Sequence, residues 1–86
     1  MLRIQRAIIG NRVVFMLSGR IEAQHIPELQ ALMNAEEQGI TLDLKEVNLV
    51  DRDTVRFLAW CEAAGVEIDN CLGYIREWIR RGTDGE

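Results

Sequence analysis

The chain has 86 residues, of which 48% are hydrophobic, and its ten Lys and Arg against fourteen Asp and Glu give a formal charge of −4 at pH 7. A chain of this length can bury about 60% of its unfolded surface, which suffices for one small domain. The acidic balance argues against binding by neutralising nucleic-acid phosphates or an anionic membrane surface, so protein partners are expected. Arg3 and Arg6 interrupt the apolar start, which predicts neither a signal peptide nor a membrane span and favours a cytoplasmic location.

The first two apolar runs predict a β-hairpin. Residues 2–9 alternate imperfectly between apolar and polar types, Gly10 and Asn11 interrupt the run, and residues 12–18 resume it with β-branched and aromatic side chains. Because residues 13–17 are continuously apolar, we expect the second strand to be buried on both faces.

Helical and strand spacings then alternate along the rest of the chain. Apolar residues recur at three- and four-residue steps from Ile26, which predicts a helix that ends near Gly39. Residues 40–50 follow with a strand pattern, and residues 53–64 with a helical one that ends at Gly65. Residues 66–69 predict a short strand, after which Leu72, Ile75 and Ile79 mark one face of a last helix.

This order of elements predicts the fold class. Helices between consecutive strands act as right-handed crossovers and make those strands parallel, whereas the first two strands form an antiparallel hairpin. We therefore expect an α/β fold, a small mixed β-sheet with an N-terminal hairpin and helices packed against it. Residues 1–82 are expected to form a single domain, and residues 83–86 a frayed tail.

The junction between the third strand and the next helix is the most informative stretch. Asp51 is the expected N-cap of that helix, and Asp53 lies in its first turn. A capping aspartate is ordinary helix chemistry worth about 1 kcal/mol. The junction also lies at the carboxyl end of an internal strand, however, where open α/β sheets bind ligands and partners, so we interpret it as a candidate binding site.

Three features of the chain resemble the STAS domain family. They are the strand that ends in Leu-x-Gly-x-Ile at residues 17–21, the Asp43–Leu44 pair in the next strand, and Asp51 at the start of the following helix. That family includes anti-sigma factor antagonists and stressosome subunits. The resemblance implies a bacterial regulatory domain that binds a kinase-type anti-sigma factor or a related regulatory assembly.

The chain departs from the family at the residue that usually controls binding. Family members carry Asp-Ser-Ser/Thr-Gly-Leu at this helix start, and a kinase phosphorylates the hydroxyl after the aspartate. Here the residues are Asp51, Arg52, Asp53, Thr54 and Val55. Because a guanidinium group cannot accept the phosphoryl group, we expect the usual serine switch to be absent.

Three interpretations of the altered turn stay open. Asp53 would supply a permanent negative charge that partly imitates phosphate. Alternatively, Arg52 and the two aspartates would form a fixed charge pattern that recognises a partner, which is the interpretation we prefer. Thr54 is a third candidate, as a phosphoacceptor, although it occupies the family's glycine position, where its hydroxyl would be poorly presented.

The predicted function is non-catalytic protein binding in the regulation of transcription. No cofactor or metal is expected, since the chain has one His, no glycine-rich phosphate loop and no nucleophile paired with a base. The two cysteines, Cys61 and Cys71, are interpreted as buried thiols. The predicted partner-binding residues are Asp51, Arg52, Asp53, Thr54, Phe57 and Trp60.

Two alternatives come from other functional classes. The domain could be a scaffold subunit that packs on copies of itself or on related domains, as its small core and surplus apolar helix surface suggest. It could also be a small-ligand or nucleotide sensor that holds an anion at the helix start, although the neighbouring aspartates disfavour a phosphate there.

Overall fold

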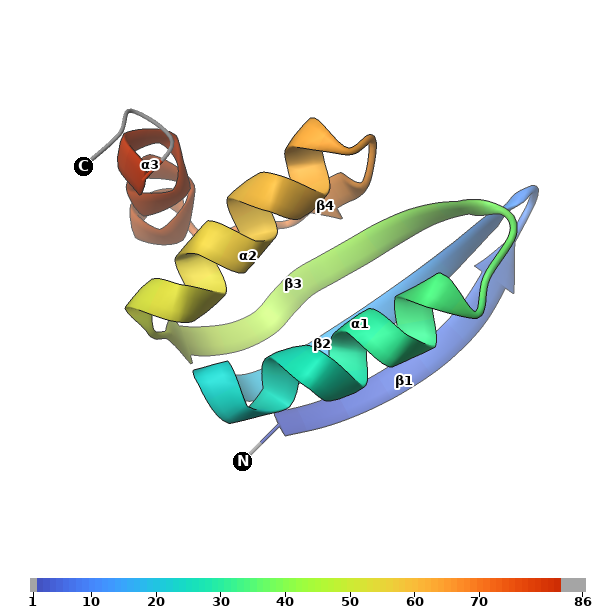
Figure 1. The fold of residues 1–86 in the computed structure, drawn as a ribbon, viewed down its shortest axis with the longest axis horizontal. Coiled ribbons are helices and arrows are strands. Elements are labelled where there is room, and N and C mark those ends of the chain that lie inside the picture. Colours follow the sequence, from blue (N-terminus) through green and yellow to red (C-terminus); the bar gives the residue numbers. More distant parts are fainter. Residues whose placement is uncertain (1, 83–86) are drawn as a thin grey trace.

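The strands form one sheet in the order β1-β2-β3-β4, and the computed structural model describes residues 2–82 (Figure 1). Strands β1 and β2 pair antiparallel, whereas β2 with β3 and β3 with β4 pair parallel. The elements are β1 (Leu2–Ile9), β2 (Arg12–Ile21), the 3-10 helix η1 (Ala23–His25), α1 (Ile26–Asn34), β3 (Gly39–Val50), α2 (Arg52–Ala63), β4 (Glu67–Asp69) and α3 (Gly73–Gly82). The predicted fold class is therefore confirmed. The tail predicted at residues 83–86 lies outside the described residues.

A two-residue turn joins β1 to β2. Ile9 pairs with Arg12, so only Gly10 and Asn11 connect the strands. Gly10 has φ +62°, a left-handed conformation that glycine adopts without steric cost. A glycine with positive φ at the first position of a two-residue loop matches the twist of a hairpin, which explains why the chain reverses there.

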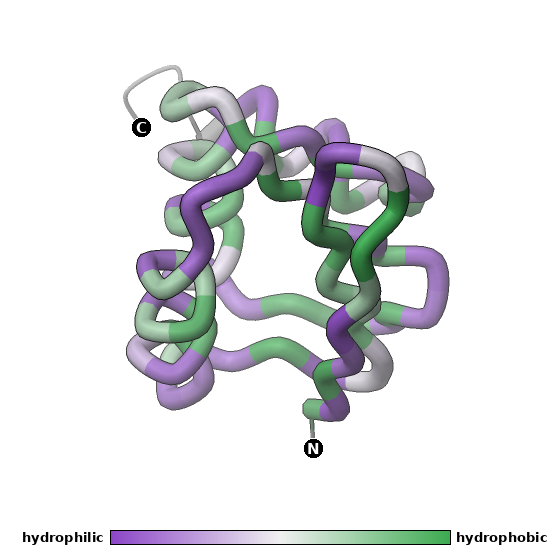
Figure 2. Tube along the Cα trace, turned by 90° about the vertical axis from the view of Figure 1, so that its right-hand side faces the viewer, coloured by the Kyte–Doolittle hydropathy of each residue, from purple (hydrophilic) through white to green (hydrophobic). Residues whose placement is uncertain are grey.

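The core lies between one face of the sheet and the helices. Helices α1 and α2 cover this face, and α3 packs beside α2 (Figure 1). Figure 2 shows the elements arranged around the centre that the buried side chains fill. Side chains from every layer are fully buried there, among them Phe15, Leu29, Leu42, Leu58 and Ile75.

The prediction that β2 is buried on both faces is wrong. Val13, Phe15 and Leu17 are buried and face the helices, whereas Val14 and Met16 alternate with them and are only partly buried. Within residues 2–82 both long crossovers lie on one side of the sheet, so the other side has no helical cover (Figure 1). The sheet is therefore a two-layer structure with an open face.

The helix predicted to end near Gly39 ends earlier, at Asn34. The following residues turn back toward the sheet, and Glu36 accepts two hydrogen bonds from the Arg6 guanidinium on β1, at 2.7 and 3.0 Å. Residues 35–38 thus form the connection that leads from α1 to the start of β3. By contrast, α2 ends at Ala63, close to the predicted end, and Gly65 follows with φ +101°.

Candidate functional site

Asp51 ties together two junctions of the fold. It is the N-cap of α2, and its Oδ1 accepts a hydrogen bond from the backbone N–H of Thr54 at 2.9 Å. Its Oδ2 accepts a second hydrogen bond, from the backbone N–H of Ala23 at 2.8 Å. Ala23 is the first residue of η1, two residues after the end of β2, so one carboxylate holds the segments that follow both β2 and β3.

Thr54 completes this connection from inside the protein. Its side chain is 0% exposed, and its hydroxyl donates a hydrogen bond to the backbone oxygen of Ile21 at 3.1 Å. The N–H of Asp51 donates to the same oxygen at 3.3 Å. A buried hydroxyl that is already bonded is closed to a kinase, so the structure argues against Thr54 as a phosphoacceptor and against a direct contact with a partner.

The pKa of Asp51 is lowered by its surroundings. Burial favours the neutral acid and is the largest single influence, but hydrogen bonds from Thr54 and Ala23 together outweigh it. The ionised carboxylate is thus the form that the fold stabilises. Asp51 acts as a structural anchor of the turn, and its two oxygens are already used inside the protein.

The next two side chains of the turn face outward. Arg52 and Asp53 are both exposed, and they are the first two residues of α2. Because Asp51 fixes the backbone beneath them, their opposite charges are presented from a rigid turn rather than from a flexible loop. A fixed pair of charges of this kind is suited to selecting a partner by electrostatic complementarity.

The two aromatic residues predicted for the site differ in exposure. Trp60 is 58% exposed, whereas Phe57 is only 7% exposed and belongs to the core. Their rings stack, with centroids 6.3 Å apart and planes 24° apart. Phe57 is therefore not exposed for contact with a partner as predicted. Its ring instead packs against the indole of Trp60.

Sequence reasoning missed Arg56, which is exposed on the same helix. It lies one turn after Asp53 and one turn before Trp60, so three- and four-residue spacing places all three on one side of α2. That spacing was the signal that could have found it. We call the set of exposed residues Arg52, Asp53, Arg56 and Trp60 the α2 surface.

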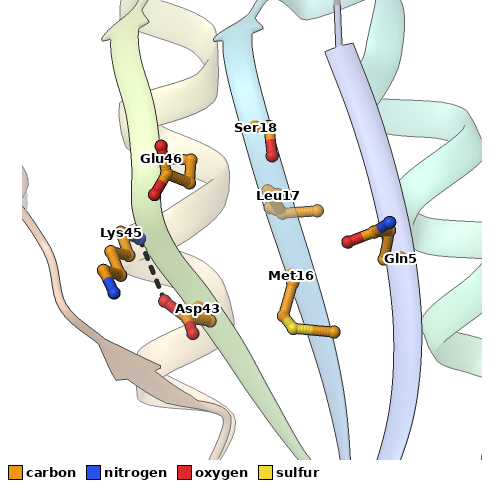
Figure 3. Close-up of a pocket in the computed structure, with 7 residues that line it drawn as sticks. All are labelled: Gln5, Met16, Leu17, Ser18, Asp43, Lys45 and Glu46. Atoms are coloured by element: carbon orange, nitrogen blue, oxygen red, sulfur yellow. Dashed lines mark hydrogen bonds between the residues drawn. The ribbon is translucent and has the colours of Figure 1, made fainter.

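Candidate metal ligands do not gather in one place among the described residues. No group of three or more His, Cys, Asp or Glu side chains among them is arranged to hold a metal ion. A shallow depression lies away from the turn, on the open face of the sheet (Figure 3). It is lined by Gln5, Met16, Leu17, Ser18, Asp43, Lys45 and Glu46.

Comparisons with known proteins give no family for the chain. Within residues 2–82 no helix has the length and apolar character needed to cross a membrane. No model of a known protein family matches the sequence, and no curated protein matches it either.

Proposed function

We propose that this chain is a cytoplasmic, non-catalytic regulatory domain of the STAS type that binds another protein through the α2 surface. The partner of the expected kind is a kinase-type anti-sigma factor or a related regulatory assembly. The observation that carries the proposal is the separation of roles within one turn. Asp51 and Thr54 are engaged inside the fold, whereas Arg52 and Asp53 are exposed on the rigid turn that results.

The composition of the α2 surface supports a protein as the ligand. Arginine and tryptophan are enriched among the residues that contribute most to protein interfaces. Here a 58% exposed Trp60 lies on the same side of the helix as Asp53 and Arg56. The indole supplies apolar contact area, and the charges around it supply orientation and a faster association rate.

The same residues suggest that binding is constitutive. Arg52 occupies the position of the family's phosphoacceptor hydroxyl, and the nearby hydroxyl of Thr54 is buried. Neither residue offers a kinase a site in the folded domain. In this proposal the domain stays competent to bind its partner, and regulation comes from the amount of the domain or of the partner.

Affinity capture of the tagged protein from its native cell extract tests the proposal. Wild type is compared with Asp53→Arg, and retained proteins are identified by mass spectrometry. Glu37→Arg is the matched control, since it makes the same change of charge at an exposed residue between α1 and β3, far from the α2 start. We expect a kinase-like or sigma-regulating protein that wild type and Glu37→Arg retain and Asp53→Arg loses.

Thermal unfolding of the three proteins separates binding from folding. Asp53 is exposed, so Asp53→Arg should change stability by less than about 1 kcal/mol. If Asp53→Arg unfolds the domain, the turn is structural and the loss of partner says nothing of recognition; Trp60→Ala then replaces it as the test. Capture that neither variant reduces would refute the α2 surface as the binding site.

A further inference from the structure

The open face of the sheet carries an ordered pattern of side chains. Strand pairing places its residues in four rows that run from β1 to β3 or β4. The rows are Arg3-Ser18-Glu46, Gln5-Met16-Asp43-Asp69, Ala7-Val14-Thr41-Glu67 and Ile9-Arg12-Gly39. Figure 3 shows the first two rows in part, with the helices behind the sheet.

Charge on this face changes sign across the strands. On the β1 side the face carries Arg3 and no acidic residue, whereas the β3 and β4 side carries Asp43, Glu46, Glu67 and Asp69. Lys45 is also exposed on β3, but it points toward the β4 side and away from Glu46 (Figure 3). The central column on β2 is apolar at Val14 and Met16, and both are only partly buried.

We propose that a second copy of this chain docks on the open face, with the two-fold axis parallel to β2. Rotation about that axis leaves β2 over the partner's β2 and sets β1 over the partner's β3. The interface is isologous, so every contact occurs twice. It lies on the side of the sheet opposite to the helices, and it is independent of the partner proposed for the α2 surface.

This symmetry sets each β1 residue over a different residue of the second copy's β3, whereas each β2 residue meets its own equivalent. Arg3 faces Glu46 of the second copy, and Gln5 faces Asp43 of the second copy, so that a cation and an amide donor each meet a carboxylate. Val14 and Met16 meet their own equivalents and remove apolar surface from water. Ile9, which is 63% exposed, lies over the second copy's Gly39 and the Arg12 side chain that packs against this glycine.

The ends of the pattern are compatible with this arrangement. Two cations, Arg12 and Arg20, lie near the ends of β2, and Arg20 Nη1 is 3.8 Å from a Glu22 carboxylate oxygen of its own chain. Arg12 is likewise held by its own chain, since its guanidinium donates to Thr41 Oγ1 at 2.9 Å and to the Ile40 oxygen at 2.8 Å. It also lies 3.7 Å from a Glu67 carboxylate oxygen. Its charge is therefore partly compensated before the second copy approaches.

A two-fold axis perpendicular to the strands fits the charges less well. It would set β1 over β1 and the acidic β3 and β4 over themselves, so that Glu67 would approach Asp69 of the second copy. Like charges placed opposite each other across an interface disfavour it. The charge pattern thus selects the axis parallel to β2.

The size of the overlap indicates a weak dimer, because β4 lies outside it. Six residues along the strands and the three strands β1, β2 and β3 across correspond to about 20 Å by about 15 Å, or roughly 300 Å² for each copy. A standard protein interface buries about 800 Å² on each side. Dimers should therefore form only at protein concentrations of roughly 100 µM or more.

Two charge-reversal variants test the proposal in solution. Arg3→Glu places two pairs of carboxylates across the interface, and Glu46→Arg places two pairs of guanidinium groups there. Sedimentation equilibrium of each variant alone should show association weakened by roughly tenfold or more relative to wild type. Glu37→Arg, an exposed residue outside the open face, is the control for charge and should associate like wild type.

Mixing the two variants gives the decisive result. In a mixed dimer the new Glu at position 3 faces the new Arg at position 46, and the native Arg3 faces the native Glu46, so an equimolar mixture should recover association at the wild-type level. Contacts within one chain cannot produce this recovery. A wild-type protein that stays monomeric at the highest concentration, or a mixture no better than its components, would overturn the proposal, provided that circular dichroism shows each variant folded.

Discussion

The carboxylate of Asp51 accepts a hydrogen bond at 2.8 Å from the backbone N–H of Ala23, which lies 28 positions earlier in the chain. This contact joins the segment that follows β2 to the start of α2. A helix cap is normally a local contact, in which a side chain bonds an N–H two or three positions ahead. Here the same side chain also makes a long-range contact, so its removal affects two parts of the fold.

Replacing Asp51 by Ala is expected to destabilise the domain by about 1–3 kcal/mol. The variant loses the helix cap and leaves the partly buried N–H of Ala23 without its acceptor. Urea unfolding followed by circular dichroism measures the change. Asp53→Ala is the matched control two residues away, and its exposed side chain should cost less than about 0.5 kcal/mol. Equal losses in the two variants would contradict the anchoring role of Asp51.

Stability is expected to fall in acid partly through Asp51. Its pKa is lowered in the folded protein by hydrogen bonds that outweigh burial, whereas an unfolded Asp titrates near about 3.9. The contribution of its charge is therefore present above about pH 4 and is lost as pH falls through the lower folded pKa. Glu36 acts in the same direction, because its hydrogen bonds to Arg6 lower its pKa.

Asp51→Asn isolates the Asp51 contribution, because the amide does not titrate. The free energy of unfolding of wild type should exceed that of the variant near neutral pH, and the difference should shrink as the pH is lowered below about 4. Urea titrations at a series of pH values provide the comparison. A difference that stays constant over the whole range would show that the charge of Asp51 does not contribute.

Part of this site was predictable because it depends on local sequence. Asp51 was identified as the N-cap of α2 from its place before an apolar helical run, and the structure confirms it. The hairpin turn at Gly10 and Asn11 was found in the same way. Helix caps and hairpin turns depend on only a few adjacent residues, so the local sequence is nearly sufficient to predict them.

The predictions that depended on distant packing were less accurate. An apolar run such as residues 13–17 does not reveal whether a second layer covers it, so β2 was wrongly expected to be buried on both faces. Phe57 and Trp60 lie three residues apart on one helix, yet only the position of the core decides that the first is buried and the second exposed. The hydrogen bond from Ala23 to Asp51 likewise depends on how the crossovers bring two loops together.

Phosphorylation should be absent from the wild-type turn and should be gained by Arg52→Ser. Thr54 is fully buried and its hydroxyl donates a hydrogen bond to the backbone oxygen of Ile21, whereas a Ser at the exposed position 52 would present its hydroxyl to a kinase. Incubation with native cell extract and ATP, followed by phosphopeptide mass spectrometry, shows whether position 52 or Thr54 carries phosphate. Phosphate on Thr54 of the folded wild type would show that the turn opens far enough to expose it.

The two cysteines are expected to differ in reactivity toward a thiol reagent. Burial raises the pKa of the Cys61 thiol to about 12, and that side chain is fully buried. Cys71 is partly exposed, and its pKa is raised as well, mainly by burial but with an opposing influence from Arg76. Because the thiolate is the reactive form, both thiols should react more slowly than a free cysteine, and Cys61 the more slowly of the two.

Mass spectrometry of the folded protein after timed alkylation at mildly alkaline pH measures this order directly. We expect Cys71 to be modified first, and Cys61 to be modified only at the rate at which the domain opens. Urea should therefore accelerate the modification of Cys61 far more than that of Cys71. Cys71→Ser provides the control, since it leaves a single thiol whose rate reports opening around α2 alone. Rapid modification of Cys61 in the folded Cys71→Ser protein would mean that the contact between α2 and the sheet opens readily.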